Sequence, residues 1–334
     1  MAEGLSQDFR YQARRILLGL ARDILSWADR ILDPHDPEPV HQMRVSINKL
    51  RVALRCFPRL APGKSSKALL DDLRWIKTCL ASVRDYDVML DRLGGLAQEA
   101  SDDQRRGVEV VLQGVENERA EAMESLCAET ARKRYRRLKE RLAAFAKDIK
   151  RNGAPRHPQD LPDSERLDAL VAKTVKSLHR RFEKRRRRLI DSFAPDVMHR
   201  FRIAAKKLRY FVTFFRDQRP ELYDPVGSTL RDLHDCVGAM HDIDVLAPKI
   251  EAIFARRFMA EPREPLEQVE PGAAWLLRRL HETRLDLMRR FYGLWEAVSS
   301  EEFAERCRRA STPPRGGISV VPPLPHGPEA TVAE

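Results

Sequence analysis

An internal repeat constrains this chain more than any other feature, because one stretch of sequence returns 158 residues later. Residues 40–57 read VHQMRVSINKLRVALRCF, and residues 198–215 read MHRFRIAAKKLRYFVTFF. The shared positions pair His41 with His199, Arg44 with Arg202, Lys49 with Lys207, Leu50 with Leu208, Arg51 with Arg209 and Phe57 with Phe215. Self-similarity at a fixed spacing is typical of chains built from copies of one structural unit.

Two further blocks follow in the same order. At an offset of 157, the second block pairs Leu73, Arg74, Cys79, Asp85, Asp87 and Val88 with Leu230, Arg231, Cys236, Asp242, Asp244 and Val245. At an offset of 156, a fainter third block pairs Arg134, Tyr135 and Leu138 with Arg290, Phe291 and Leu294. The chain is therefore predicted to hold two similar units, residues 1–150 and 164–310, joined by a Pro/Gly linker over 151–163.

The apolar residues recur at three- and four-residue spacing, and alternating β-branched runs are missing, which predicts an all-α fold. Helix-breaking residues fall at 33–39, 58–63, 94–95, 153–162, 220–225 and 261–272. They divide the chain into eight expected helices, four in each unit, near 6–32, 38–57, 66–93, 101–149, 164–192, 196–218, 226–257 and 272–308. The Pro- and Gly-rich tail over 311–334 is expected to be disordered.

A cationic stripe runs along the second helix of each unit. At 100° per residue, the polar positions beside the apolar face fall within an arc of roughly 80°. They are His41, Arg44, Asn48, Arg51 and Arg55 in the first unit, and His199, Arg202, Lys206, Arg209 and Thr213 in the second. No carboxylate occurs between Glu38 and Asp71 or between Asp196 and Asp217. Uncompensated charge repels itself, so both stripes predict a bound anion. Because they lie off the apolar face, we expect the stripe arginines to be exposed.

The net charge of +11 also favours an anionic partner: nucleic acid, anionic lipid or polyphosphate. No apolar stretch approaches the roughly 20 residues that cross a bilayer, so membrane insertion is not expected. The N-terminus lacks the apolar centre of a secretory signal, and five scattered cysteines form no CxxC pair. These features predict a cytoplasmic protein with no metal site and no cofactor.

The repeated H-x-x-R-x-x-x-x-K-L-R motif, at 41–51 and 199–209, resembles that of the CHAD family of α-helical domains. The segments RDYDV at 84–88 and HDIDV at 241–245 are similar to it too. The resemblance covers roughly residues 6–308. It implies two similar helical bundles around a pseudo-two-fold axis, with a basic groove or pore between them. It also implies binding of inorganic polyphosphate and localisation on polyphosphate granules. Because the cationic stripe is duplicated and no metal-ligand set has a second copy, we expect this binding to be non-catalytic.

Carried over by motif, the anion-binding residues in the first half are His41, Arg44, Lys49, Arg51 and Arg55, with Arg74 from the second block. In the second half they are His199, Arg202, Lys206, Lys207 and Arg209, with Arg231 from the second block. Asn48 stands where the second half has Lys206, which predicts unequal half-sites. Lys49 and Lys207 lie off the stripe. The acids Asp85, Asp87, Asp242 and Asp244 are expected to hold arginines in position. A histidine beside phosphates is expected to be protonated more readily than usual.

Two alternatives remain open. The residues His199, His234, Asp235, His241, Asp242 and Asp244 resemble the metal site of HD-type phosphohydrolases, although the first unit has Lys77 and Arg84 where the second has His234 and His241. The basic clusters at 132–141 and 184–188 would suit a nucleic-acid backbone. Aromatic residues that could stack on bases are not interleaved with the stripes, apart from Tyr210.

Overall fold

The computed structural model of this chain describes residues 9–57, 63–151, 164–218, 220–260 and 265–312. Within them, every regular element is a helix, so the all-α prediction is confirmed. The linker expected from residue 151 and the tail expected from residue 311 lie almost wholly outside the described residues. The elements are α1 (Phe9–Trp27), α2 (Glu38–Cys56), α3 (Gly63–Ala97), α4 (Asp102–Ala131), α5 (Lys133–Arg151), α6 (Ser164–Asp191), α7 (Pro195–Phe214), η3 (Arg216–Gln218), α8 (Pro220–Ala260), α9 (Leu266–Ser299) and α10 (Glu301–Ala310).

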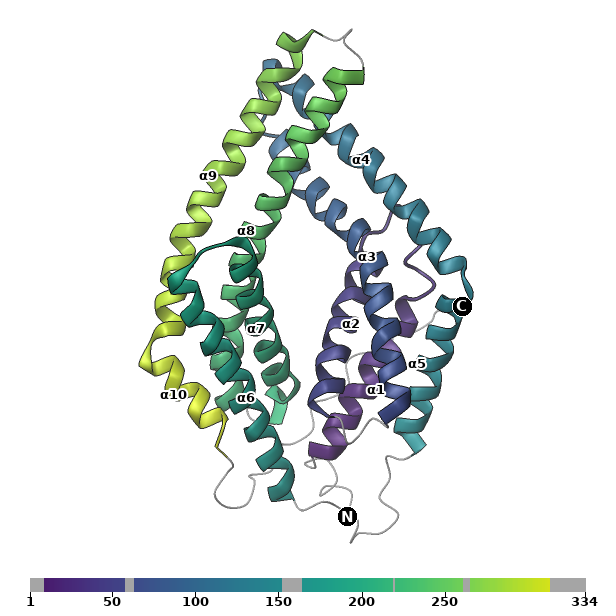
Figure 1. Cartoon of the computed structure of the whole chain (residues 1–334), viewed down its shortest axis with the longest axis vertical. Helices are drawn as coiled ribbons and strands as arrows, with labels where there is room; N and C mark the ends of the chain where they lie inside the picture. The colour runs from purple at the N-terminus through teal and green to yellow at the C-terminus, as the bar shows by residue number, and fades with distance from the viewer. Residues whose placement is uncertain (1–8, 58–62, 152–163, 219, 261–264, 313–334) are drawn as a thin grey trace, which may run out of the picture.

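The helices form two sides that converge at one end (Figure 1). On one side α1 packs on α2 and α5, α2 packs on α3, and α3 packs on α4 and α5. On the other side α6 packs on α7 and α10, α7 packs on α8, and α8 packs on α9 and α10. Helix for helix, α1–α5 and α6–α10 therefore follow the same order of contacts. At the converging end α4 packs along α9 and also touches α8.

Two of the eight expected helices are each divided in two. The expected helix 101–149 breaks at Arg132, whose backbone is extended (φ −74°, ψ 153°), and the expected helix 272–308 breaks at Ser300 (φ −69°, ψ 151°). Each break turns an aromatic residue three positions later into the core. Tyr135 is buried and donates a hydrogen bond of 2.6 Å to the Ala28 carbonyl. Phe303 is buried, and its backbone N–H donates to the capping Ser300 hydroxyl.

These breaks show that the third sequence block was aligned wrongly. Tyr135 lies in the first turn of α5, whereas Phe291 lies well inside the continuous helix α9. Counted from the break, the residue that corresponds to Tyr135 is Phe303. The physical reason is that a single aromatic residue near an arginine recurs easily by chance on two basic helices, whereas the break and its inward-facing ring define the packing.

Several expected helix breakers lie inside helices. α3 continues through Gly94 and Gly95, α8 contains Pro225, and α9 contains Pro271. Pro248 also lies inside α8, within the expected helix 226–257. An interior proline costs about 3 kcal/mol through its lost hydrogen bond and steric clash. Long helices that pack along neighbours on both sides offset this cost, which local propensity does not include.

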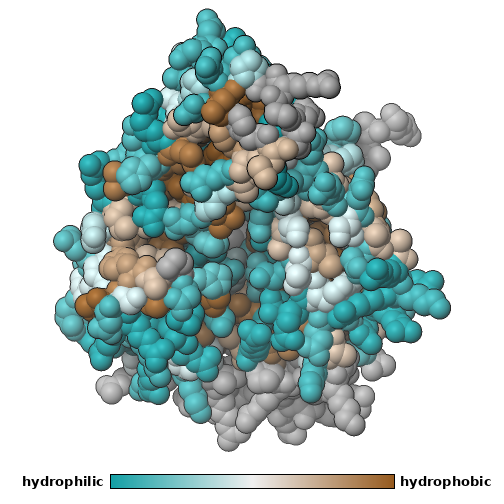
Figure 2. All heavy atoms as spheres, turned by 45° about the horizontal axis from the view of Figure 1, so that its top comes forward, coloured by the Kyte–Doolittle hydropathy of each residue, from teal (hydrophilic) through white to brown (hydrophobic). Residues whose placement is uncertain are grey.

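One hydrophobic core links the two sides. Phe57, just after α2, lies 6.0 Å from Phe211 of α7 and 5.9 Å from Phe215, just after α7, measured between ring centroids. The repeat pairs Phe57 with Phe215, so counterparts from the two halves touch each other. A second core cluster joins α3, α4, α8 and α9 at the converging end. Figure 2 looks toward that end and shows mostly hydrophilic side chains, with hydrophobic ones exposed towards the top. No described helix is long and apolar enough to span a bilayer.

Candidate anion-binding site

The two cationic stripes meet, because α2 and α7 lie in contact at the centre of the molecule (Figure 1). Arg44 of α2 interacts electrostatically with both Arg202 and Lys206 of α7. Lys77 of α3 joins them, since it is within electrostatic reach of Arg44, Arg51 and Arg202. We call the following residues, three from each half, the central cation cluster: Arg44, Arg51, Lys77, Arg202, Lys206 and Arg209.

Lys77 is a member that the motif comparison did not select. The second sequence block places His234 opposite Lys77 at the offset of 157, and His234 lies beside Arg202, Arg209 and Lys206. Both residues therefore belong to the site, one from each half. The offset of 157 pairs these two positions in the sequence, and a cation at position 77 fits an anion site rather than a metal site.

Burial and mutual repulsion dominate the electrostatics of the cluster. Burial, the largest cause, and the neighbouring Arg202, Lys77, Arg44 and Arg209 together lower the pKa of Lys206 to about 7. Burial, together with Arg202, Arg209 and Lys206, lowers the pKa of His234 to about 3. The pKa of Lys77 is lowered as well, first by burial and then by Arg51 and Arg44. The lowered pKa values show that the side chains of the cluster repel one another. A bound anion would reduce this repulsion.

The expectation that all stripe arginines are exposed is wrong for most of them. Arg51, Arg202 and Arg209 are partly buried, and each has a buried Nε without a hydrogen-bond partner among the described residues. A Cβ on Gly238 of α8 would lie 3.3 Å from a terminal nitrogen of Arg202. The position that corresponds to Gly238 in the first half is Ala81, whose carbonyl accepts a hydrogen bond of 3.1 Å from Arg44. The helix that follows each stripe thus covers its first arginine.

The carboxylates of the second block lie beside arginines, as expected. Asp85 pairs with Arg44 at 3.1 Å and Asp244 with Arg284 at 2.5 Å. Asp87 is buried and pairs at 2.7 Å with Arg119, which also donates to the Pro34 carbonyl at 2.9 Å. Burial raises the pKa of Asp242, and the charge of Arg202 opposes that shift. Of these four acids, only Asp85 forms an ion pair with a member of the central cation cluster.

The two motif histidines lie at the edge of the cluster. Burial lowers the pKa of His41, and Arg84 lowers it further. Burial also lowers the pKa of His199, together with His241, whose ring centroid is 5.9 Å away, and Arg202. In the anion-free protein both histidines are therefore harder to protonate than usual. Their easier protonation beside phosphates remains a prediction for the occupied site.

The other predicted site residues lie further out. Arg55 is exposed, and Arg74 is exposed and paired with Asp71 at 2.8 Å, but both are within electrostatic reach of Arg51. Arg231 is exposed on α8, and among the described residues no hydrogen bond or ion pair joins it to the cluster. Lys49 lies beside Asp23 of α1, and Lys207 lies beside Arg181 and Arg185 of α6. Lys207 is also within electrostatic reach of Arg55 and Arg51, which belong to the stripe on α2.

The residues of the alternative metal site do not converge. His234 contacts Asp235 at 3.2 Å, while His199 lies beside His241. Over the part of the chain that the structure describes, no group of three or more His, Cys, Asp or Glu side chains is arranged to hold a metal ion.

The basic cluster at 132–141 is largely neutralised by carboxylates. Arg134 and Arg141 both pair with the buried Asp72. Arg132 pairs with Glu129, and Lys139 pairs with Asp29 at 2.8 Å. This cluster is therefore better described as an ion-paired helix surface than as an anion site.

Comparison with known proteins agrees with this architecture. The family model described as the CHAD domain matches residues 15–251. The crystal structure of the CHAD domain from the plant Ricinus communis is similar to this chain, with a TM-score of 0.63 and 24% sequence identity; the match covers 87% of this chain and 92% of that chain. PptA from Streptomyces chartreusis is similar with a TM-score of 0.56 and 15% identity, over 85% of this chain and 98% of that chain. No curated protein matches the chain.

Proposed function

The chain belongs to the CHAD domain family, and from this premise we propose that it binds inorganic polyphosphate at the central cation cluster without hydrolysing it. The observation that carries the proposal is the contact between halves, where Arg44 and Lys77 approach Arg202 and Lys206. Arg51, Lys77, Arg202 and Lys206 form no ion pair with any described carboxylate. A polyanion would supply the missing counter-charge.

We also propose that the chain is an internal duplication, arranged as two bundles around a pseudo-two-fold axis. The shared order of helix contacts supports this. The contact between Phe57 and Phe215 supports it further, because counterparts meet where such an axis passes. Each proposed bundle contains five helices rather than the expected four, since the last helix of each is divided.

Polyphosphate suits this site because it carries charge on every phosphate and has no bases to be read. Arginine forks bind phosphate oxygens in bidentate fashion, and lysine adds point charge. The site offers little to a metal-dependent hydrolase, since His234 is surrounded by Arg202, Arg209 and Lys206, which would repel a divalent cation. Nucleic acid is the weaker candidate, because aromatic platforms for its bases are sparse around the cluster.

A double variant with one charge removed from each half tests the proposal. Lys77→Gln with Lys206→Gln should weaken binding of long-chain polyphosphate by at least roughly tenfold in calorimetric titration, since a charge-assisted contact is worth about 1.5–3 kcal/mol. The matched control, Lys173→Gln with Lys176→Gln, removes the same charge from exposed positions on α6 and should bind like the parent. Equal affinity of the two double variants would reject the central site.

Two further measurements address the alternatives. Incubation with polyphosphate should release no phosphate, with or without magnesium or manganese; metal-dependent release abolished by His241→Ala would favour the hydrolase. At fixed ionic strength, duplex DNA at equal phosphate concentration should fail to displace polyphosphate, and efficient displacement would favour the nucleic-acid reading.

Within cells, we propose that the protein resides in the cytoplasm on polyphosphate granules. A fluorescent fusion of the protein should form foci that disappear in cells unable to synthesise polyphosphate. The same fusion carrying Lys77→Gln and Lys206→Gln should stay diffuse. Foci that persist without polyphosphate would contradict this localisation.

A further inference from the structure

A second concentration of positive charge lies in a groove between α6 and α7, outside the central cation cluster. Its volume is about 460 Å³, and three apolar residues, Leu178, Ile203 and Ala204, line it together with six cations. These cations are Arg181, Lys184, Arg185, Arg188, Arg200 and Lys207, and the lining contains no carboxylate. We call this feature the α6–α7 groove.

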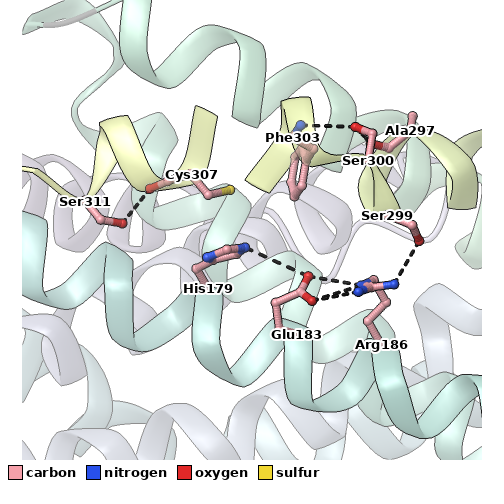
Figure 3. Close-up of polar contacts among 9 residues, drawn as sticks. All are labelled: His179, Glu183, Arg186, Ala297, Ser299, Ser300, Phe303, Cys307 and Ser311. Atoms are coloured by element: carbon pink, nitrogen blue, oxygen red, sulfur yellow. Dashed lines mark hydrogen bonds and ion pairs between the residues drawn. The ribbon is translucent and has the colours of Figure 1, made fainter. Parts of the chain in front are cut away.

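The basic residues of α6 divide between two faces. Arg186 faces α9 and α10, where it pairs with Glu183 at 2.8 Å and donates to the Ser299 hydroxyl at 2.9 Å (Figure 3). His179 lies on the same face, 3.9 Å from Glu183. At 100° per residue, Arg181, Lys184, Arg185 and Arg188 lie on the opposite face, within an arc of roughly 100°. The basic cluster at 184–188 thus contains one residue in a neutralised network, Arg186, and three that line the groove, Lys184, Arg185 and Arg188.

The groove cations lack the neutralisation seen elsewhere on the surface. Arg200 pairs with Asp196. Among the described residues, however, Arg181, Lys184, Arg185, Arg188 and Lys207 form no ion pair and no side-chain hydrogen bond. By contrast, Arg279, Arg306 and Arg308 on the neighbouring helices α9 and α10 each pair with a glutamate. An unpaired group of this size is unusual for a helix surface that merely faces water.

Equivalent positions in the first half carry the opposite arrangement. Lys49 interacts there with Asp23, an acid–base pair. The same pair of positions, shifted by 158, is Lys207 and Arg181, which interact as two cations. The positions that correspond to Lys184 and Arg185 are Ser26 and Trp27. Four of the six groove cations, Arg181, Lys184, Arg185 and Arg200, therefore have no cationic counterpart in the first half, so most of the charge of the groove belongs to the second half.

The groove and the central cation cluster are connected through cations. Burial lowers the pKa of Lys207, and so do Arg55, Arg181, Arg51 and Arg185, so Lys207 stands between residues of both features. Arg51 belongs to the cluster, and Arg55 follows it by one turn on α2. Cations therefore continue from the centre of the molecule to the face of α6.

We propose that the α6–α7 groove is a second phosphate-binding site, which holds a further stretch of the same polyphosphate chain that occupies the central cation cluster. This inference rests on the proposed function. Polyphosphate is favoured over nucleic acid because no aromatic ring lines the groove, so bases would find no stacking platform. Occupation of both features by one chain makes affinity depend on chain length.

Tripolyphosphate, which is far shorter than a long polyphosphate chain, tests for two sites by stoichiometry. Calorimetry should find two tripolyphosphate sites on the parent protein. The triple variant Arg181→Gln, Arg185→Gln, Arg188→Gln should keep one tripolyphosphate site. It should also bind long-chain polyphosphate with at least tenfold lower affinity. The matched control is Lys176→Gln with Arg180→Gln and Arg187→Gln, which removes the same charge from exposed positions of α6 outside the lining, and it should retain both sites.

The outcomes separate this inference from the proposed function. An unchanged stoichiometry in the groove variant overturns the groove, whatever the cluster does. If the Lys77→Gln/Lys206→Gln variant keeps full long-chain affinity, the central site fails, and with it the shared chain. If the groove variant loses duplex DNA binding while polyphosphate binding is unaffected, the groove is a nucleic-acid contact and the inference is wrong. Circular dichroism should show parental helix content in each variant.

Discussion

Gly107 of α4 and Gly272 of α9 lie face to face where the two helices cross, and each occupies the space that a side chain on the other would need. A Cβ on Gly107 would lie 2.8 Å from the Gly272 Cα, and a Cβ on Gly272 would lie 2.7 Å from the Gly107 Cα. Each added carbon would also collide with a backbone oxygen, of Val269 or Gln104 respectively. The two halves of the chain are therefore joined at this crossing backbone to backbone.

Replacement of Gly107 by alanine should push the two helices apart. The colliding atoms belong to backbones that cannot rotate away, so the change should lower the free energy of unfolding by about 1–3 kcal/mol or more. Urea denaturation followed by circular dichroism measures it. Gly293→Ala on α9 is the control: a Cβ there would meet no atom within 4 Å. That variant should be more stable by about 0.5–1 kcal/mol through helix propensity. Equal stability of the two variants would show that the crossing is looser than described.

Asp87 should contribute to stability and Asp85 should not, although both lie in the same RDYDV motif. Asp87→Ala leaves the largely buried Arg119 without its carboxylate, and breaking such a pair costs about 3–5 kcal/mol. Asp85 is exposed, so Asp85→Asn should leave the free energy of unfolding nearly unchanged. The Asp85 carboxylate also repels an anion bound at Arg44, and the substitution removes this repulsion. It should also tighten polyphosphate binding at low salt. Thermal unfolding and titration of both variants would test this, and weaker binding by Asp85→Asn would assign Asp85 a positioning role.

Much of the fold could be predicted from the sequence because helix periodicity is a local signal. The sequence did not predict the breaks at Arg132 and Ser300, because the apolar periodicity continues through both positions. The breaks are stabilised by the burial of Tyr135 and Phe303, which depends on the tertiary structure. Ser300, followed by Glu301 and Glu302, is a capping pattern that was available. Pro225 and Pro271 were expected to break helices, yet they lie inside α8 and α9, because packing along neighbouring helices outweighed their local cost.

The candidate site was predicted in part, because a motif defines a helix face and not what lies across from it. Arg44 and Arg202 were identified from their own helices. Lys77 was not, since it reaches the cluster only when α3 packs on α2. The burial of Arg202 beneath Gly238 likewise depends on the packing of α8 on α7. A helical wheel of α7 alone cannot predict it.

Polyphosphate binding should weaken as the pH rises above neutrality. In the free protein, burial and the neighbouring Arg202, Lys77, Arg44 and Arg209 together lower the pKa of Lys206 to about 7. A bound anion favours the charged lysine and raises that pKa, so binding takes up a proton above pH 7. Affinity should therefore fall by up to about tenfold per pH unit until the pKa of the bound state is reached. Calorimetry in buffers of different ionisation enthalpy measures the proton. Lys206→Met should abolish the uptake, and uptake that persists in this variant would move its source to another residue.

The two half-sites should contribute unequally. In the first half Asp85 neutralises Arg44, and Asn48 stands where the second half has Lys206. Arg202→Gln with Arg209→Gln should therefore weaken long-chain binding more than Arg44→Gln with Arg51→Gln, with losses of roughly a hundredfold or more for the stronger effect. Glutamine is preferred to alanine because Arg202 and Arg209 are partly buried and a truncated side chain would leave a cavity. Removal of charge from a self-repelling cluster should also keep or raise the unfolding temperature of the anion-free protein. Weaker binding together with a lower unfolding temperature would indicate damage to the fold, and equal losses from the two half-sites would contradict the asymmetry.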